Sequence, residues 1–413
     1  MAEAATFPTG LSVEEARERI VEICRARLLP PERIALESAL GRTLARDAIA
    51  PFDIPGFTNS AMDGFALRGR DLPESGGKEF RVIGEILAGG APPPEVGEDS
   101  CVRIMTGAPL PRGADTVVMK ENTQARGDRV IVSAGTASGA NVRPAGEDYR
   151  SGEAGVLRGD ELTPARVGVL ASFGMSQVDV ARRPRVVLLT TGDELVEPGK
   201  PLGFGQIHDS NRHSLGGLIE QHGAILLRHE RVRDDPMSLR DALSRAGADA
   251  DLIVSSGGVS AGDADFLPGL IAKIGKVHFW KVRIKPGMPF LLGEVGGALA
   301  FALPGNPVSG IAIFLTLLKP ALATLAGANG QPSMLRARLA LPVDKRHARA
   351  EFLRARLASD EQAVLWASPQ TRQGSGMLRG VAEADALVML PEGARVFSVG
   401  DVVEVLALPG WPR

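Results

Sequence analysis

Apolar runs alternate with amphipathic segments between about residues 183 and 330. The apolar runs end in loops rich in Gly, Ser and Asp, and they predict strands at 185–189, 224–232, 251–255, 277–284 and 298–303. The amphipathic segments predict helices at 211–222, 236–246, 265–274 and 308–326. Strands that alternate with helices imply a mainly parallel sheet that is covered on both faces. Ligands bind such sheets at the carboxyl ends of the strands, so the loops there form the candidate site.

The N-terminal part of the chain has a different texture. Ser12 followed by Glu15 is a capping-box pattern and predicts a helix to about Arg27, and a second helical piece is predicted at 36–45. From 51 to 144, short β-branched runs separated by Gly and Pro clusters predict a small β-rich domain. A helix predicted at 163–173 is expected to pack back onto the first helix, which makes the β-rich domain an insertion in a mostly helical one.

The C-terminal part is predicted to be all-β. After Asn329-Gly330, strand-like runs recur at 334–341, 351–357, 363–366, 386–390 and 401–406. These runs favour a β-barrel or a β-sandwich of roughly 80 residues.

Composition narrows the class of protein. The 413 residues are 44% hydrophobic and 23% charged, which is typical of a globular protein with sizeable cores and, at ~100–200 residues per domain, predicts two to four domains. The 47 basic and 49 acidic side chains give a formal charge of −2, without the basic excess that nucleic acids or anionic membranes require. Two cysteines make a disulfide framework or a Cys-based zinc cluster improbable.

A cytoplasmic location is expected from the same observations. The first residues lack the cationic start and apolar core of a signal peptide. The longest apolar run, 308–318, is interrupted by Lys319 and Pro320 and is shorter than the ~20 residues of a membrane span.

Two of the strand-end loops combine groups that bind phosphate with groups that bind metals. They are 190–195 (TTGDEL) and 255–265 (SSGGVSAGDAD). Glycines let backbone N–H groups converge on a phosphate, and carboxylates in the same loop then require a cation between them. This combination predicts Mg²⁺, although a Gly-rich turn with Asp caps explains the same residues at about even odds.

The other two loops are less specific. In 280–289 (WKVRIKPGMP), Lys281, Arg283 and Lys285 alternate, so on a strand all three project from one face, either around an anion or into solvent. In 303–309 (LPGNPVS), Asn306 is a natural helix cap and Pro307 a natural first helical residue, so local structure alone explains that loop.

The β-rich domain contributes motifs that are weak when taken singly. Segment 59–65 (NSAMDGF) is typical of a type I′ hairpin turn, and 105–109 (MTGAP) of a loop. Segments 146–148 and 233–236 add carboxylates, of which Asp235 is a natural cap for the helix that begins at Pro236. The chain has no Walker A loop, no GxGxxG and no HExxH.

The motifs taken together resemble the MoeA family of molybdopterin molybdenumtransferases, which are similar to the E domain of gephyrin. The resemblance rests on 59–65, 105–109, 191–195 (TGDEL), 257–260 (GGVS), 285–289 (KPGMP) and 303–309, in this order along essentially the whole chain. GGVS and PGNP are shared with the smaller MogA-type adenylylating proteins, whereas the long N-terminal part with NSAMDG favours MoeA.

The resemblance implies an α/β multidomain fold. Its parts are a helical and extended N-terminal domain (1–50 and 145–182), an inserted β-rich domain (51–144), a MogA-like three-layer α/β domain with a mainly parallel sheet (183–330) and a C-terminal β-barrel (331–413). It also implies a homodimer whose active cleft lies between the α/β domain of one subunit and the β-rich domain of its partner. MogA-type adenylyltransferases and molybdoenzyme acceptors are the expected protein partners.

The resemblance further implies a reaction. Adenylylated molybdopterin and molybdate, with Mg²⁺, yield molybdenum cofactor and AMP. Residues at functional positions of the family are Asp63, Thr106, Asp148, Glu194, Asp234, Asp265, Lys281 and Lys285 as catalytic residues, and Gly257, Gly258, Ser260, Pro304, Gly305, Asn306, Pro307, Arg354 and Ser375 as substrate-binding residues. Glu194 and Asp265 are the expected metal ligands, and Asp63 is expected to act in the partner subunit's site.

One departure from the family puts a contact in doubt. The family commonly has KPGKP where this chain has KPGMP, and the thioether of Met288 carries no charge. Arg283 is the expected substitute, because a guanidinium can fork onto oxyanion oxygens. Two alternatives to the molybdenum-insertion enzyme remain: an adenylyltransferase or nucleotide hydrolase on the same α/β domain, and a non-catalytic binding module like the gephyrin scaffold.

Overall fold

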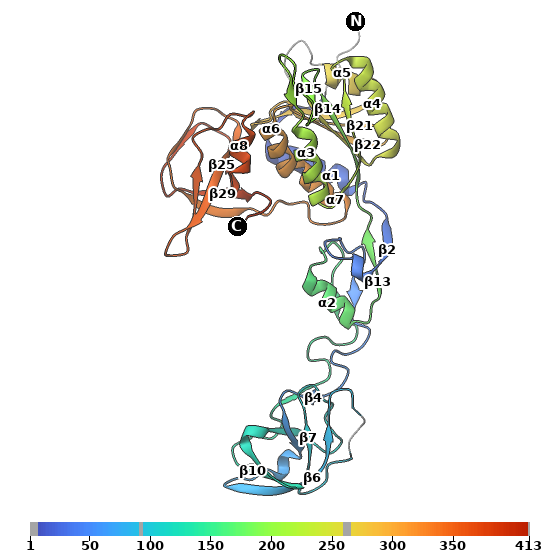
Figure 1. Cartoon of the computed structure of the whole chain (residues 1–413), viewed down its shortest axis with the longest axis vertical. Coiled ribbons are helices and arrows are strands. Elements are labelled where there is room, and N and C mark those ends of the chain that lie inside the picture. The colour runs from blue at the N-terminus through green and yellow to red at the C-terminus, as the bar shows by residue number, and fades with distance from the viewer. Residues whose placement is uncertain (1–6, 91–93, 259–265, 412–413) are drawn as a thin grey trace. The chain divides into compact units, whose positions relative to one another are not determined.

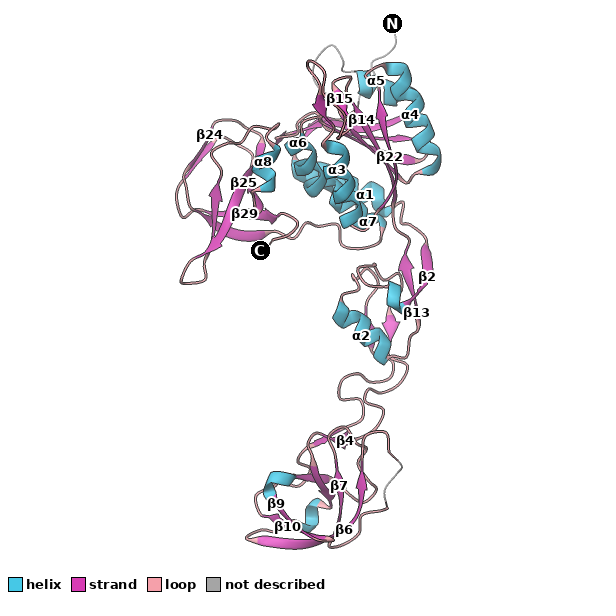
Figure 2. Ribbon diagram, viewed as in Figure 1, coloured by secondary structure: helices cyan, strands magenta, loops and turns pink. Residues whose placement is uncertain are grey.

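The computed structural model describes residues 7–90, 94–258 and 266–411. Two compact units emerge. Unit 1 comprises Met1–Arg33, Gly41–Ala45 and Asp179–Arg413, and unit 2 comprises Ile34–Leu40 and Arg46–Val178. Each unit has its own sheets and cores (Figures 1 and 2).

Unit 1 contains a seven-stranded sheet with helices on both faces. Its strands, in sheet order, are β1 (Thr9–Leu11), β19 (Gly275–Val282), β21 (Leu291–Val295), β22 (Ala298–Leu303), β18 (Leu252–Ser256), β14 (Arg185–Thr191) and β17 (Ile225–Val232). Strands β22, β18, β14 and β17 are mutually parallel, and β21 runs antiparallel to both of its neighbours. The carboxyl ends of β19, β22, β18, β14 and β17 therefore meet at one edge of the sheet.

Alternation along the buried strands decides which helices cover which face. Val186 and Leu188 pack in one core, and Val187 and Leu189 pack in another, because successive side chains of a strand point to opposite faces. The first face is covered by α1 (Val13–Arg25), α3 (Asn211–Gln221), α6 (Pro307–Ile313) and α7 (Lys319–Leu325), and the second by α4 (Pro236–Asp249) and α5 (Phe266–Ile274) (Figure 1). The predicted three-layer α/β architecture is confirmed.

The C-terminal part of unit 1 is a closed barrel. Its strands, in order, are β25 (Ala350–Ser359), β26 (Leu365–Pro369), β23 (Leu335–Leu339), β29 (Val402–Ala407) and β27 (Ala386–Leu390), and β27 pairs back with β25. A short strand, β20 (Ile284–Lys285), joins the barrel sheet beside β25. The barrel rather than the sandwich is thus confirmed. The remaining elements of unit 1 are β15 (Leu195–Val196), β16 (Ile207–His208), β24 (Val343–Lys345), β28 (Arg395–Phe397) and α8 (Leu378–Ala382).

Unit 2 is centred on a six-stranded sheet. Its strands, in order, are β8 (Thr116–Met119), β5 (Gly64–Leu67), β7 (Ser100–Ile104), β6 (Gly77–Ile86), β10 (Arg129–Ser133) and β9 (Thr123–Arg126). Smaller elements are β3 (Ala48–Ile49), β4 (Asn59–Ser60), β11 (Val142–Arg143), β12 (Ala154–Val156), α2 (Pro164–Ser172) and the 3₁₀ turns Leu36–Ser38, Gly69–Asp71 and Lys120–Asn122. Strand β2 (Pro31–Ala35) pairs with β13 (Gln177–Ala181), and the residues of both strands are divided between the two units. The predicted β-rich texture of this region is confirmed.

Of the two helices predicted near the N-terminus, the first is confirmed and the second is wrong. The capping box is present: the Glu15 N–H donates to Ser12 Oγ (3.1 Å), and the Ser12 N–H donates to Glu15 Oε2 (2.7 Å). The helix predicted at 36–45 is wrong, because only the turn Leu36–Ser38 forms and Gly41 takes a left-handed φ of 71°. Helix α1 packs against α7 within unit 1 and α2 packs against β12 within unit 2, and the expected packing of α2 onto the first helix stays a prediction.

One helical stretch in the described part of the chain, Pro307–Leu325, has the length and apolar composition of a membrane span. It joins α6, a π-helical turn at Phe314–Leu318 and α7, so Lys319 and Pro320 do not end the helix although they break the apolar run. Within its most apolar window, 89% of the residues are buried inside the protein. This stretch is the central core helix of unit 1.

Candidate active site

A cavity of about 940 Å³ opens at the carboxyl edge of the seven-stranded sheet in unit 1. Its volume falls at the upper end of the range that holds small-molecule ligands. Loops that follow β14, β17, β18, β19 and β22 line it, and the C-terminal part of the chain adds residues 349, 351–353 and 373–376. The site thus lies where the sheet rule predicts, with a further wall from the barrel.

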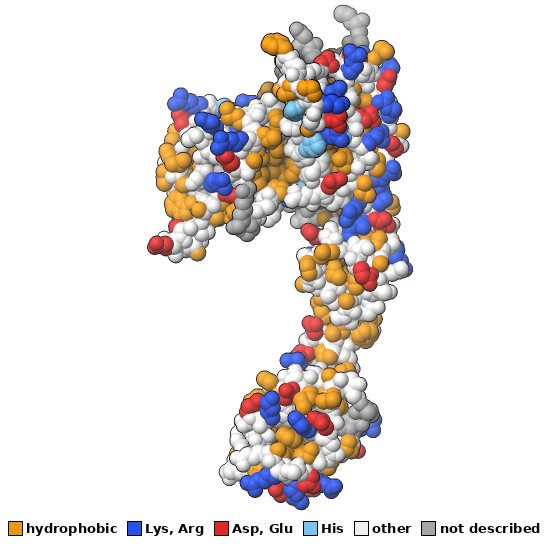
Figure 3. Space-filling view, viewed as in Figure 1, with side chains coloured by type: hydrophobic (Ala, Val, Ile, Leu, Met, Phe, Trp, Pro, Cys, Tyr) orange, Lys and Arg blue, Asp and Glu red, His pale blue; other side chains and the backbone are white. Residues whose placement is uncertain are grey.

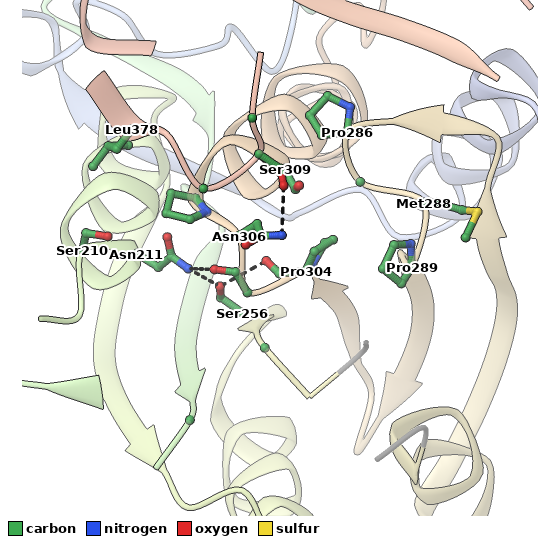
Figure 4. Close-up of a pocket in the computed structure, with 18 of the residues that line it drawn as sticks. Ser210, Asn211, Ser256, Pro286, Met288, Pro289, Pro304, Asn306, Ser309 and Leu378 are labelled. Carbon is green, nitrogen blue, oxygen red and sulfur yellow. Dashed lines mark hydrogen bonds between the residues drawn. The ribbon is translucent and has the colours of Figure 1, made fainter. Parts of the chain in front are cut away.

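The loop between β22 and α6 is tied to the C-terminal part by Asn306. This residue occupies the N-cap position of α6, but its side chain does not cap the helix. Instead, Asn306 Nδ2 donates to Ser375 Oγ (3.0 Å), the bond drawn from Asn306 in Figure 4. The Val308 N–H also donates to the Ser375 carbonyl (3.1 Å). Pro304, Gly305, Asn306, Pro307 and Ser375 all line the cavity, so these predicted substrate-binding residues are brought together.

The glycines after β18 allow a close approach to β14. Gly257 and Gly258 have φ values of 101° and 70°, and a Cβ at Gly257 would lie 2.5 Å from Thr191 Oγ1. Both glycines line the cavity. Ser260 and Asp265 follow in the same loop and lie outside the described residues. Their predicted roles stay predictions.

Two buried polar atoms beside this loop lack a hydrogen-bond partner within the described part of the chain. They are Thr191 Oγ1 and Asn211 Oδ1, and both residues line the cavity. The amide nitrogen of Asn211 is satisfied, since it donates to Ser256 Oγ (2.8 Å) and to the Gly305 carbonyl (2.7 Å) (Figure 4). Unsatisfied buried polar atoms are costly, so their position in a ligand-sized cavity favours a polar ligand there.

We call Glu194 and Asp234, which follow β14 and β17, the acidic group of the cavity; Asp209 and Glu351 line the cavity as well. The pKa of Asp234 is raised, first because the surrounding protein displaces water and then because the carboxylates of Asp193, Glu194 and Asp235 lie nearby. Asp235 is the cap of α4, as predicted, and accepts from the Ser238 N–H (2.9 Å). Like charges gathered without a cation are unfavourable, so this donor set fits a bound cation.

Mg²⁺ would suit this donor set better than a metal held by protein side chains alone. Among the described residues, no three His, Cys, Asp or Glu side chains converge on one point. Mg²⁺ is usually held by one or two carboxylates together with substrate phosphates. Glu194 and Asp234 meet that requirement, whereas the second predicted ligand, Asp265, is not among the described residues.

The basic group of the cavity consists of Lys285 and Arg349. Lys285 Nζ lies 2.8 Å from Glu351 Oε1. Arg349 Nη1 lies 3.9 Å from Met288 Sδ, so a guanidinium lies beside the residue that stands in place of the family's second lysine. The sequence reasoning missed Arg349. The signal in the sequence was a run of basic residues at 345–349 just before a strand, but the contact joins positions 61 apart.

The expectation that Lys281, Arg283 and Lys285 share one strand face is wrong. Lys281 has a left-handed φ of 60°, which breaks the alternation, and β19 ends at Val282. Lys281 Nζ lies 3.8 Å from the centre of the Trp280 ring, and Lys281 does not line the cavity of unit 1. Its catalytic role stays a prediction.

Arg283 is not the substitute for the missing lysine. Its Nε lies 2.9 Å from Glu392 Oε1, its Nη2 lies 3.8 Å from Glu15 Oε2, and it also donates to the Gly10 carbonyl. These partners neutralise it, and it does not line the cavity.

Arg354 does not take the predicted substrate-binding position. Its side chain is 1% exposed and does not line the cavity. Nη1 donates to the Gly374 carbonyl (3.1 Å) and Nη2 to the Arg372 carbonyl (2.6 Å), so the guanidinium supports the loop that carries Ser375 from behind. Its pKa is lowered by burial.

The remaining predicted residues belong to unit 2. Asp63 Oδ1 accepts from the Thr106 N–H (2.9 Å) and from Thr106 Oγ1 (2.8 Å), and these bonds lower the pKa of Asp63. The segment is not the hairpin turn that its Asp-Gly pair favours, because the strand before it, β4, pairs with β11 and the strand after it, β5, pairs with β7 and β8. Gly64 is required there, because a Cβ would lie 2.0 Å from the Val118 carbonyl oxygen of β8.

Asp63 and Lys120 border a second cavity of about 680 Å³, within unit 2, and Lys120 Nζ lies 3.9 Å from Asp63 Oδ2. Asp148 lies apart from it in an exposed loop, where its N–H donates to the Ile54 carbonyl (2.9 Å). The predicted catalytic residues thus divide between the two units. On the visible faces, Lys and Arg side chains are interspersed with Asp and Glu (Figure 3).

Comparisons with known proteins cover nearly the whole chain. Residues 11–174 match the MoeA N-terminal region (domain I and II), 187–324 a probable molybdopterin binding domain, and 336–408 the MoeA C-terminal region (domain IV). The molybdopterin molybdenumtransferase of Haemophilus influenzae is 36% identical over 402 residues, which are 96% of this chain and 98% of that protein. The chain belongs to the MoeA family of molybdopterin molybdenumtransferases. It is therefore an enzyme, a transferase of molybdenum cofactor biosynthesis.

Two further relatives support the same family assignment. The molybdopterin molybdenumtransferase of Staphylococcus aureus strain COL is 34% identical over 401 residues, 96% of this chain and 95% of that protein. A crystal structure of a molybdopterin biosynthesis MoeA protein from Pyrococcus horikoshii covers 97% of this chain and 100% of its own, with 31% identity and a TM-score of 0.80. The family membership makes the cavity of unit 1, in the probable molybdopterin binding domain, the candidate active site.

Proposed function

We propose that this transferase takes adenylylated molybdopterin and molybdate and, with Mg²⁺, yields molybdenum cofactor with release of AMP. The observation that carries the proposal is the composition of the cavity in unit 1. It combines an acidic group (Glu194 and Asp234), glycine-rich loops with unsatisfied polar atoms, and a basic group (Lys285 and Arg349) along one sheet edge. A substrate diphosphate and an oxyanion require such a combination, whereas a neutral ligand does not.

The order of strands separates these groups. Strands β21, β22 and β18 lie between β19, which leads to Lys285, and β14, which leads to Glu194. Neighbouring strands are about 4.8 Å apart, so the acidic and basic groups stand at different places along the cavity, with the Gly257 and Pro304–Pro307 loops between them. We infer that the diphosphate lies along the middle loops and that molybdate lies at the basic group.

Within this arrangement each group has a physical task. Lys285 and Arg349 hold the oxyanion, and the Asn306–Ser375 pair fixes the loop beside it. Glu194 and Asp234 would hold Mg²⁺, which would supply positive charge to the phosphoryl oxygens as the anhydride bond breaks. Positioning and electrostatic stabilisation carry most of the catalysis in reactions of this class.

The family also implies a homodimer that works in the cytoplasm. In this proposal Asp63, held by Thr106, acts in the partner's site, and Asp148 and Lys281 complete the shared cleft. A shared site has a specific test: mixing an Asp63→Asn chain with a Lys285→Met chain should restore activity in heterodimers. Mixed subunits with no gain over the separate variants would contradict a shared site.

The test of the proposed reaction is a turnover assay with adenylylated molybdopterin that scores AMP. AMP release should depend on both molybdate and Mg²⁺. A second reaction mixture with molybdopterin and ATP distinguishes the adenylyltransferase alternative. Turnover of ATP in that mixture, without molybdate-dependent AMP release in the first, would overturn the proposal.

A further inference from the structure

Lys285, the lysine of the basic group, is part of a closed cluster with Glu351 and His347. Lys285 Nζ lies 2.8 Å from Glu351 Oε1 and 3.2 Å from His347 Nε2, and His347 Nε2 lies 3.2 Å from Glu351 Oε2. Lys285 and Glu351 are register partners on the parallel strands β20 and β25. The pairing of these two strands therefore builds the cluster directly into the backbone.

The environment of Glu351 makes this pairing stronger than an ordinary surface ion pair. Glu351 is only 7% exposed, whereas the side chain of Lys285 is 44% exposed and faces the cavity. A charge pair with one partner withdrawn from water is less screened than an exposed pair. In this cluster, the ammonium that an oxyanion would use already has a counter-ion.

His347 cannot satisfy both of its neighbours. Burial lowers the pKa of His347, and the charges of Lys285, Lys345 and Arg349 lower it further, whereas Glu351 opposes the shift. The lowered pKa favours the neutral ring. With its proton on Nε2, the ring donates to Glu351 and offers Lys285 no lone pair. With its proton on Nδ1, that N–H is buried without a partner among the described residues.

The backbone of His347 is held by a buried lysine. Lys345 Nζ donates to the His347 carbonyl (2.7 Å) and to the Gly393 carbonyl (2.6 Å), and Lys345 is 2% exposed. Either tautomer of His347 thus leaves one interaction of the cluster unmade. The cluster therefore holds Lys285 in place, although not all of its hydrogen bonds can form at once.

We propose that Glu351 is a positioning residue that competes with the substrate oxyanion for Lys285, so that Glu351 sets the affinity of the cavity for molybdate. The inference rests on the proposed function, because it names the control of one of its binding groups. Glu351 orients the ammonium toward the cavity and limits how tightly an oxyanion is held there. The advantage of this limit is that the oxyanion group leaves readily with the product.

The test uses the full-length chain and molybdate as the probe. In Glu351→Gln the side chain keeps its shape and loses its charge, so Lys285 is freed and molybdate should bind about tenfold more tightly, a step of 1.4 kcal/mol. Calorimetric titration measures the affinity, and the KM for molybdate in the AMP-release assay should fall while kcat does not rise. A merely structural role for Glu351 predicts the opposite sign, namely weaker binding.

The chain offers a matched control. Arg283 and Glu392 form the same kind of pair, with Nε 2.9 Å from Oε1, and neither residue lines the cavity. Glu392→Gln should leave molybdate affinity unchanged within about twofold. A second control is Glu351→Gln in a Lys285→Met background, where the tightening should disappear.

If the Glu351→Gln variant does not fold, Glu351→Asp tests the same competition for Lys285. The shorter carboxylate withdraws from Lys285 and should tighten molybdate binding about two- to threefold. Molybdate affinity that is unchanged or weaker in a folded Gln or Asp variant, beside a wild-type chain that binds molybdate, overturns this inference alone. A wild-type chain that neither binds molybdate nor releases AMP with it overturns the proposed function instead.

Discussion

The acidic and basic groups of the cavity in unit 1 hold their charges in opposite ways. In the described part of the chain, Glu194 and Asp234 have no ion-pair partner, and neighbouring carboxylates raise the pKa of Asp234. Lys285, in contrast, is neutralised by Glu351 at 2.8 Å. The acidic group thus requires a cation from outside, whereas the basic group is already balanced and must exchange its counter-ion for the substrate.

The largest effect is expected from removing the lysine of the basic group. Lys285→Met should lower AMP release about 10²–10³-fold, because the ammonium that holds the oxyanion in the cavity is lost. The turnover assay measures it, with Arg283→Met as the control whose charge is held outside the cavity. A Lys285→Met enzyme with turnover within threefold of wild type would show that the basic group does not hold the oxyanion.

A change in the acidic group should separate activity from stability. Asp234→Asn should lower turnover about 10- to 100-fold and raise the Mg²⁺ concentration needed, since one ligand loses its charge. At neutral pH it should also raise Tm by about 1 °C, because like charges are relieved. Asp235→Asn, which keeps a helix-cap side chain, is the control for turnover.

The pH dependence of that stability gain has a definite sign. A carboxyl group whose pKa is raised by folding contributes stability that is present below its ordinary pKa of about 3.9 and is lost as pH rises through the raised value. The Tm advantage of Asp234→Asn should therefore appear as pH rises through that window and vanish in acid. Thermal melts across pH would contradict this account if the variant were less stable than wild type at neutral pH.

Arg349 and Met288 offer a rescue experiment within the basic group. Arg349→Ala should raise the KM for molybdate about tenfold, because the guanidinium beside Met288 Sδ is removed. Met288→Lys restores a charge at the family's position, so it should recover most of this loss in the Arg349→Ala background and change the KM less than threefold alone. If Met288→Lys alone lowers the KM tenfold, Arg349 does not replace the missing lysine.

The smallest effect is expected from the link between the two parts of unit 1. Asn306→Ala removes the 3.0 Å bond to Ser375 Oγ and should raise the KM for molybdate about two- to threefold. Ser375→Ala should have the same effect, and the double variant should add little, as a double-mutant cycle reveals. Additive effects would mean that the two side chains act separately.

Much of the fold could be read from the sequence because its signals are local. The Ser12–Glu15 capping box, the buried strand β14 and the five barrel strands follow from spacing and alternation within a few residues. The missed strand β21 had a local signal as well, since Gly296-Gly297 separates two apolar runs and both glycines have positive φ. The resemblance to the MoeA family supplied the rest of the predicted fold.

The site could be predicted only in part because its charges are arranged by distant contacts. A left-handed φ at Lys281 separates three alternating cations that the spacing places on one face. Arg354 looks like an oxyanion ligand in sequence, yet burial commits its guanidinium to backbone carbonyls. Arg349 and Glu351 enter the site through the pairing of β20 with β25, which links segments more than 60 residues apart.

The central claim is that the oxyanion binds at the basic group of the cavity in unit 1. Crystals of the full-length chain soaked with molybdate, and measured at the molybdenum absorption edge, test it most directly. The account predicts an anomalous peak within hydrogen-bond distance of Lys285 and Arg349, close to Ser375. A peak found instead only at surface arginines outside this cavity, such as Arg372 and Arg379, would contradict it.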